Sequence, residues 1–238
     1  MIGERHRFSY GSHIVEFTIV RRNRETLAIS VEPDKSVVVA APQTVPVDAI
    51  VQRVRKRARW IVRQQDYFAQ FAPRTPARRF LSGETHLYLG RQYRLKVVQD
   101  STPCVKLVGG HFVVHSDFPA RPDVTKSLLN DWYQVKAQVK FQERLEATLS
   151  RFPDPAAFRP AMLTVRQLRL RWGSMNAAAH LVLNQRLVQA PVDAIDYVIA
   201  HELCHVAVLN HSAEFLEFLG GVMPDWARRK ERLERYLA

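Results

Sequence analysis

The sequence has 238 residues, 47% of them hydrophobic and 10% aromatic, which is enough to bury a core as one large domain or two small ones. This composition excludes a disordered chain. The formal net charge of +12 and the pI near 10.1 mean that anionic partners, nucleic acid among them, are attracted before specific contacts form. The alternative is a basic protein whose arginines lie on solvated surfaces.

Cysteine usage and hydropathy indicate a cytoplasmic protein. Cys104 and Cys204 lie far apart in the sequence, which argues against a disulfide framework. The first residues lack the apolar segment of a signal peptide, and no apolar run is long enough to span a bilayer. We therefore expect no membrane association.

The amino-terminal part has the alternation typical of strands. Apolar and polar residues alternate over 14–20, 27–31 and 37–39, which predicts an antiparallel meander. The basic segment 21–24 between the first two strands is expected to be a charged hairpin loop, or a contact for phosphates.

A helical pattern follows over residues 46–71, with one basic face that either is solvated or follows an anionic polymer. Trp60 is expected in the core. The basic residues of this helix are Arg53, Arg55, Lys56, Arg57, Arg59 and Arg63. The proline-broken stretch 72–79 then forms a first candidate domain boundary.

Two hairpins are predicted next, turning at Gly90-Arg91 and at Gly109-Gly110. Their histidines, His86, His111 and His115, match no metal-binding spacing and are expected on the surface. A second boundary at 119–122 precedes a long amphipathic helix, which should end near Leu149 and pack behind the helix of the site. Its apolar side is expected to contain Val124, Leu128, Trp132, Val135, Val139, Leu145 and Leu149.

The remaining chain before the site is predicted to contain two strands, over 163–170 and 180–185, joined by a loop at 171–176. If the strand around Leu181 has an open edge, an extended peptide could add to it through main-chain hydrogen bonds.

The stretch 195–212 carries the chemistry. His201 and His205 are four residues apart, so they project from one face of a helix and could bind one ion, with Glu202 beside them. The neighbouring residues are nearly all apolar, which predicts a buried helix. Buried imidazoles and a carboxylate need partners, and a cation with a bound water would satisfy all three.

A catalytic zinc site requires a third protein ligand, and His211 is the nearest candidate. A straight helix would carry it about 9 Å along the axis, so the helix must end first. Asn210 suits a left-handed helix terminus, and Ser212 suits the cap of a following helix. If His211 is not a ligand, the alternatives are His180, Glu214 and Glu217. After a short helix from 213 to 219, Gly220-Gly221 is expected to break the chain before a terminal helix over 224–237.

These residues resemble the YgjP-like zinc metallopeptidase family, which is related to the SprT-like proteases. The resemblance rests on several short motifs: residues 21–24, 38–42, 56–61, 171–174, 184–187, 190–191, 195–198, 201–205 and 210–212. It implies zinc ligation by His201, His205 and His211, and a catalytic acid/base role for Glu202.

The sequence thus predicts an α+β fold. An antiparallel β-rich half with one helix, over 1–118, should precede a zincin-like half over 119–238 with a small sheet, unless both form one compact unit. The predicted function is zinc-dependent peptide hydrolysis of a protein or peptide substrate. Tyr197, His180 and Arg186 are candidates for a second oxyanion donor. The competing functions are a nucleic-acid-associated protein with a structural zinc, and a protease that acts on proteins bound to nucleic acid.

Overall fold

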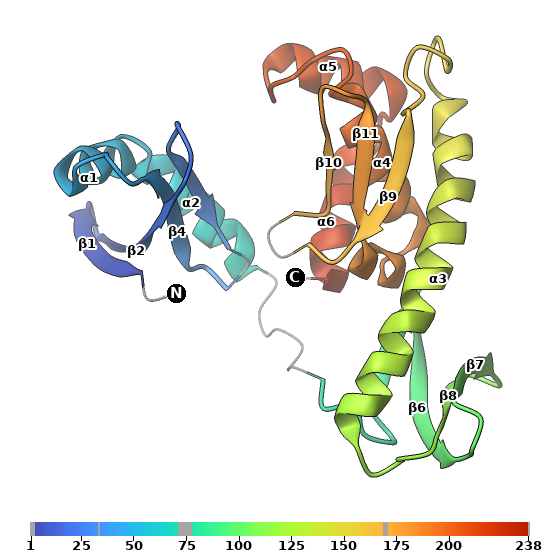
Figure 1. Ribbon diagram of the computed structural model, residues 1–238. Helices are drawn as coiled ribbons and strands as arrows, with labels where there is room; N and C mark the ends of the chain where they lie inside the picture. Colours follow the sequence, from blue (N-terminus) through green and yellow to red (C-terminus); the bar gives the residue numbers. More distant parts are fainter. Residues whose placement is uncertain (1–2, 33, 71–77, 169–170, 238) are drawn as a thin grey trace. The chain divides into compact units, whose positions relative to one another are not determined.

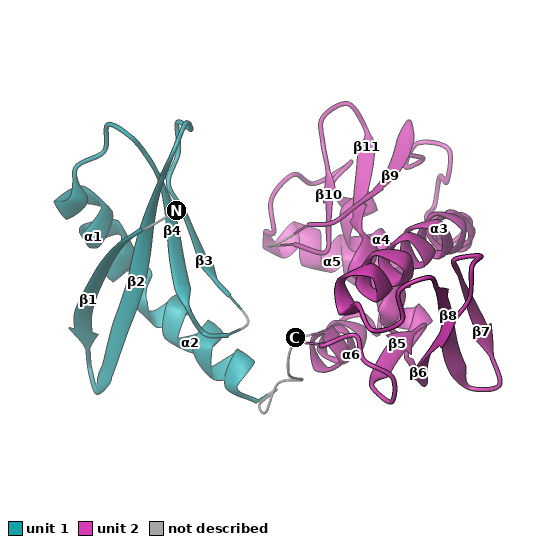
Figure 2. Ribbon diagram, turned by 60° about the horizontal axis from the view of Figure 1, so that its bottom comes forward, with its two compact units in different colours: residues 1–75, 238 teal, residues 76–237 magenta. Residues whose placement is uncertain are grey.

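The computed structural model describes residues 3–32, 34–70, 78–168 and 171–237. The chain forms two compact units, residues 1–75 with residue 238, and residues 76–237 (Figure 2). Most of the predicted connection at 72–79 lies outside the described residues. Position 118 falls inside the second unit, because the helix that follows it packs against the strands that precede it.

The α+β prediction is confirmed. The described residues contain six α-helices and three small sheets, each with both parallel and antiparallel pairs (Figure 1). The prediction of purely antiparallel strands in the amino-terminal half is wrong, since a parallel pair joins the second and fourth strands of each four-stranded sheet.

The first unit has a sheet of order β1-β2-β4-β3, in which β2 and β4 run parallel. Its strands are β1 (Glu4–Tyr10), β2 (His13–Arg22), β3 (Ala28–Val31) and β4 (Val37–Pro42). The predicted meander is therefore incorrect. Strand β4 buries Val37, Val39 and Ala41 and takes a central position, which leaves the short, more exposed β3 at the edge.

Two helices cover this sheet, where one was predicted. Helix α1 (Val47–Lys56) and helix α2 (Ala58–Ala69) are separated only by Arg57. Ile50, Val54 and Ile61 are fully buried against the apolar face of the sheet, which gives the first unit a core of its own.

The second unit begins with another four-stranded sheet, of order β5-β6-β8-β7. Its strands are β5 (Thr85–Tyr88), β6 (Arg91–Gln99), β7 (Cys104–Val108) and β8 (His111–Ser116). Both predicted hairpins are present, and Gly109 and Gly110 both have positive φ at the second turn. The surface prediction fails for His86, which is 5% exposed, whereas His111 is exposed and His115 hydrogen-bonds Asp100.

Helix α3 (Pro122–Leu149) follows and spans the unit from this sheet to the next (Figure 1). Its buried face repeats at four-residue spacing and includes Leu129, Tyr133, Ala137, Phe141 and Leu145. The predicted buried face is partly wrong, because Val135 and Val139 are 58% and 66% exposed.

The third sheet has the order β10-β11-β9, with β11 in the middle. Its strands are β9 (Met162–Arg166), β10 (Gly173–Met175) and β11 (His180–Asn184). The predicted loop at 171–176 therefore contains a strand. Leu181 lies on a strand paired on both sides, so the edge strands in the described part of this sheet are β10 and β9, and not β11.

The remaining chain is helical. A 3-10 turn (Gln185–Gln189) leads to α4 (Val192–Cys204), α5 (Ala213–Val222) and α6 (Trp226–Leu237). Gly220 and Gly221 lie within α5, so the predicted break there is incorrect; the helix ends at Val222, and Met223 is its carboxy-terminal cap.

Candidate metal centre

Helix α4 is the most deeply buried helix segment of the second unit. Every residue from Ala194 to Cys204 is buried except His201, which is half-buried. Apolar residues surround the helix because α3, α6 and strand β10 pack against it. Packing therefore fixes the direction in which its polar side chains project.

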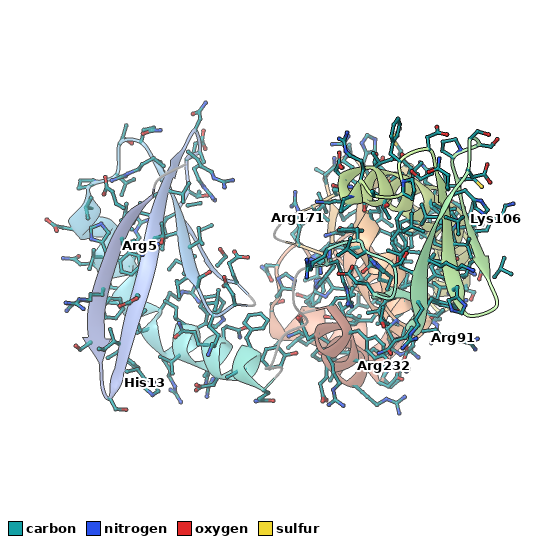
Figure 3. The ribbon with its side chains drawn as sticks, turned by 90° about the horizontal axis from the view of Figure 1, so that it is seen from below. Arg5, His13, Arg91, Lys106, Arg171 and Arg232 are labelled. Carbon is teal, nitrogen blue, oxygen red and sulfur yellow. The ribbon has the colours of Figure 1, made fainter. Side chains whose placement is uncertain are left out.

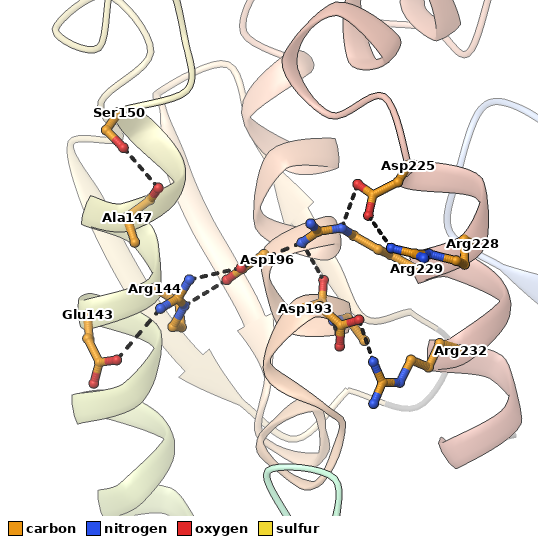
Figure 4. A network of polar contacts seen from close by, with 11 residues as sticks. Glu143, Arg144, Ala147, Ser150, Asp193, Asp196, Asp225, Arg228, Arg229 and Arg232 are labelled. Atoms are coloured by element: carbon orange, nitrogen blue, oxygen red, sulfur yellow. Dashed lines mark hydrogen bonds and ion pairs between the residues drawn. The ribbon is translucent and has the colours of Figure 1, made fainter.

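Ionic contacts also hold α4 in place (Figure 4). The buried carboxylate of Asp196 accepts two hydrogen bonds from Arg144 of α3, at 2.7 and 2.9 Å. Arg229 of α6 lies 3.7 Å from the same carboxylate and also pairs with Asp225 at 2.8 Å. The network joins α4 to the helices on its two sides.

The helix ends earlier than predicted. Its last residue is Cys204, His205 caps it in right-handed conformation, and the amides of Ala207 and Val208 both donate to the Cys204 carbonyl. Asn210 does not have positive φ, so the expected left-handed terminus is wrong. The tight turn after Cys204 ends the helix without it.

The chain then returns toward the helix. Ser212 caps α5 as predicted, and its hydroxyl accepts a hydrogen bond from the amide of Phe215 at 3.4 Å. The turn and this cap bring His211 back beside the first two histidines. Leu209, which was expected in the buried helix, instead lies beyond its end and is 84% exposed.

Three imidazoles form a cluster that could hold a metal ion. His201, His205 and His211 each offer one ring nitrogen, and these nitrogens lie within 4.8 Å of one another. Nε2 of His201 and Nε2 of His211 are 2.9 Å apart. In the described part of the chain no other group of this kind is found, and His180, Glu214 and Glu217 are not in the cluster.

The protonation chemistry of the cluster suits a cation. Nδ1 of His205 is 3.0 Å from the carbonyl oxygen of Val208, which can only accept a hydrogen bond, so Nδ1 is the donor and Nε2 is the ring nitrogen left for an ion. Burial lowers the pKa of His201 to about 3 and also lowers that of His211, with the neighbouring imidazoles adding to both shifts. Neutral imidazoles with free lone pairs are the form that binds metals.

Phe215 supports all three rings. It is fully buried, and its ring centroid lies 4.9 Å from that of His201, 4.7 Å from that of His205 and 4.9 Å from that of His211. Sequence analysis missed this residue, although its position three residues after a helix cap places it on the buried side of α5.

Glu202 projects toward strand β10 rather than toward solvent. Burial raises the pKa of its carboxyl group to about 7, while a hydrogen bond with the backbone of Met175 and the charge of Arg171 oppose that shift. A Cβ atom at Gly173 would lie 2.8 Å from Cγ of Glu202, so only glycine leaves room for the carboxylate. The short strand therefore positions Glu202 by hydrogen bonding and by close approach.

The cluster and Glu202 line one cleft of about 480 Å³. Of the predicted oxyanion donors, Tyr197 lines the cleft, whereas His180 and Arg186 do not. Arg186 instead stacks over Trp172, with its guanidinium carbon 5.8 Å from the ring centroid. Arg171 and Lys230 also line the cleft and were not predicted as site residues. Arg171 belongs to the motif 171–174, to which no role was assigned, and Lys230 belongs to none of the quoted motifs.

The arrangement of a helix with two imidazoles and a carboxylate, and a third imidazole returned by the following turn, is typical of metallohydrolases, and here it lies on a mixed α+β fold. Comparison with known families agrees with this class. Residues 25–236 match the YgjP-like metallopeptidase domain, and the chain belongs to this family.

Comparison with curated proteins finds no match to the chain. None of the helices in the described residues has the length and apolar character required to cross a membrane.

Proposed function

We propose that the chain is a zinc-dependent peptidase in which Glu202 is the general base. The observation that carries the proposal is the placement of a buried carboxylate and three imidazoles in one cleft. His201, His205 and His211 would hold the ion. Three imidazoles are the donor set of a catalytic zinc site, which keeps one position open, whereas structural zinc sites are closed by four protein ligands.

Zinc held in this way supplies Lewis acidity, which lowers the pKa of water toward about 7 and polarises a carbonyl. Glu202 then accepts a proton from the attacking water. A carboxyl group with a pKa of about 7 is well matched to this transfer near neutral pH. The same group returns the proton to the leaving amine, so the carboxylate is regenerated at the end of the cycle.

The substrate is expected to bind along β10. Among the described strands, β10 pairs with β11 on one side only, and its three residues line the cleft. An extended peptide could add to the open side through main-chain hydrogen bonds, which would bring a peptide carbonyl close to Glu202.

The test compares Glu202→Gln, His205→Ala and the unchanged protein for zinc content and for hydrolysis of fluorescent casein. Glu202→Gln should keep the metal and lose hydrolysis, whereas His205→Ala should lose both. Glu214→Gln, which changes an exposed carboxylate of α5, is the matched control and should keep both. Full activity in Glu202→Gln would refute the mechanism, and unchanged metal content in His211→Ala would remove His211 from the ligand set.

A further inference from the structure

The first unit carries a hollow of about 450 Å³ that the peptidase chemistry does not use. Basic side chains reach solvent on both units, for example Arg5, Arg91 and Arg232, so charge alone does not locate a binding site (Figure 3). The hollow differs because cations, an aromatic ring and apolar side chains meet in one concavity. Its lining residues are Leu27, Ile29, Arg53, Lys56, Arg57 and Trp60.

Trp60 is central to this hollow. Sequence analysis places it in the core, but its side chain is 38% exposed. Arg53 and Lys56 lie in the last turn of α1, and Arg57 separates that helix from α2. Trp60 lies in the first turn of α2, so the junction of the two helices brings all four side chains to one hollow. Leu27 and Ile29, beside and on the edge strand β3, provide the apolar side.

The charge of the hollow is uncompensated. Residues 49–65 contain six basic and no acidic side chains. No carboxylate lines the hollow, and within the described residues Arg53, Lys56 and Arg57 make no ion pair. Arg55, on another face, lies over the ring of Phe8 instead, 5.3 Å from its centroid.

We propose that this hollow binds single-stranded nucleic acid, with one base stacked on Trp60 and the adjacent phosphates paired with Arg53, Lys56 and Arg57. An exposed indole among cations is the combination that binds single strands without sequence preference. A duplex keeps its bases stacked inside and could offer only phosphates. An acidic peptide would satisfy the cations but would leave the indole without a flat partner.

The binding does not depend on the proposed peptidase activity, because the hollow and the histidine cluster lie in different compact units. Arg63 lies three residues beyond Trp60 on the same helical face and extends the basic path by one turn. The single strand of nucleic acid would therefore follow the axis of α2 past the hollow.

The test measures binding of the full chain to fluorescein-labelled oligothymidine by anisotropy, over a range of salt concentrations. Trp60→Leu keeps apolar bulk but loses the aromatic face, and it should weaken binding about 10-fold; Trp60→Phe should retain most of the affinity. Arg53→Gln with Lys56→Gln should lower the slope of log affinity against log salt by about 1.4. The matched control, Arg22→Gln with Arg59→Gln, removes two exposed charges that do not line the hollow.

The proposal is supported if Trp60→Leu is weaker than Trp60→Phe and if the hollow pair loses more affinity than the control pair. It is overturned if Trp60→Leu binds as tightly as the unchanged protein. Equal losses of affinity in the hollow pair and in the control pair would also overturn it, because binding would then depend on overall positive charge and not on the hollow. Unlabelled polyglutamate could also displace the labelled oligothymidine. If it does so as well as unlabelled oligothymidine, and if its binding is weakened equally by Trp60→Leu, the hollow would be assigned to acidic peptides instead.

Discussion

Single residues of β10 decide where the carboxylate of Glu202 lies. Gly173 approaches it so closely that an added Cβ would also lie 2.9 Å from Oε1. The contact is with a flexible side chain rather than with backbone, so the carboxylate and not the fold would move. Strand β10 therefore serves the site by fixing the space that the Glu202 side chain can occupy.

We predict that Gly173→Ala retains metal but hydrolyses peptide about 100-fold more slowly, because a displacement of about 1 Å can cost a catalytic group that much. Zinc analysis and casein hydrolysis measure the two effects. Gly221→Ala is the control: its Cβ would meet nothing within 4 Å, and activity should not change. Normal activity in Gly173→Ala would show that Glu202 has room to adjust.

His86 should make stability fall in acid. Burial lowers its pKa to about 4, with repulsion from Arg78 adding to the shift and Glu84 opposing it. The folded protein therefore binds the proton less readily than the unfolded chain, whose histidines titrate near 6.5. The contribution of His86 to the free energy of unfolding is constant above pH 6.5. It is lost as the pH falls toward 4, by about 2 kcal/mol between pH 7 and pH 5.

Urea unfolding at pH 7 and at pH 5 tests this, with His86→Gln as the variant. The loss of stability in acid should be smaller in His86→Gln by about 2 kcal/mol. His111→Gln removes an exposed histidine of the same sheet and should leave the pH dependence unchanged. An identical loss in His86→Gln would assign the acid sensitivity to other groups.

At the scale of elements, α4 is held by contacts on several sides. The ion pairs of Asp196 join it to α3 and α6. Its amino-terminal end meets the turn between β5 and β6, where the amides of Leu89 and Gly90 donate to the carbonyls of Val188 and Gln189. Gly90 has positive φ and lies against Pro191, so a side chain would be both strained and obstructed there.

We predict that Asp196→Asn lowers the free energy of unfolding by about 3 kcal/mol, because it leaves the Arg144 guanidinium without its buried partner. Asp193→Asn is the matched control on the same helix. Its partner Arg232 is 49% exposed, and the loss should stay below about 1 kcal/mol. Chemical denaturation compares the two, and equal losses would mean that burial does not strengthen the Asp196 pair.

Sequence periodicity predicted most elements but not how they pair. The alternation around Ile19 and Val39 identifies strands, yet it contains no information on whether a neighbour runs parallel or antiparallel. The four-residue spacing of His201 and His205 predicted that both side chains project from one face of a helix. The sequence indicated that a turn must bring His211 back, but it did not indicate where the helix ends. The helix ends at Cys204 through local backbone hydrogen bonds, which no particular residue type predicts. Gly173 and Phe215 act through tertiary contacts with Glu202 and the three histidines, which sequence periodicity does not reveal.

At the scale of the whole molecule, the two units have separate cores. The buried cluster around Val39, Ile50 and Ile61 shares no residue with the cluster around Phe141, Leu183 and Phe215. Each unit also repeats one arrangement, a four-stranded sheet with a parallel pair of second and fourth strands, followed by helix. The likeness lies in the strand order and pairing of the two sheets.

We predict two transitions in thermal unfolding, because cores that share no side chains need not melt together. A metal that binds only folded protein stabilises the unit that contains its ligands. Chelation should therefore lower one melting temperature and leave the other in place. Calorimetry with and without chelator measures this, with His205→Ala as the control that should not respond. A single transition that shifts as a whole would contradict it.

The parallel pairing of β2 with β4 has a practical consequence. The family match begins at residue 25, after β2 has ended, yet β4 needs β2 beside it to complete the first sheet. A shortened protein that starts at the family boundary would keep Val39 but lose Phe17 and Ile19, the buried residues that cover it from the neighbouring strand. The edge of β4 that becomes exposed would promote aggregation during expression. Recombinant versions intended for crystallisation or assays should therefore include β1 and β2, even though the recognisable family sequence starts later.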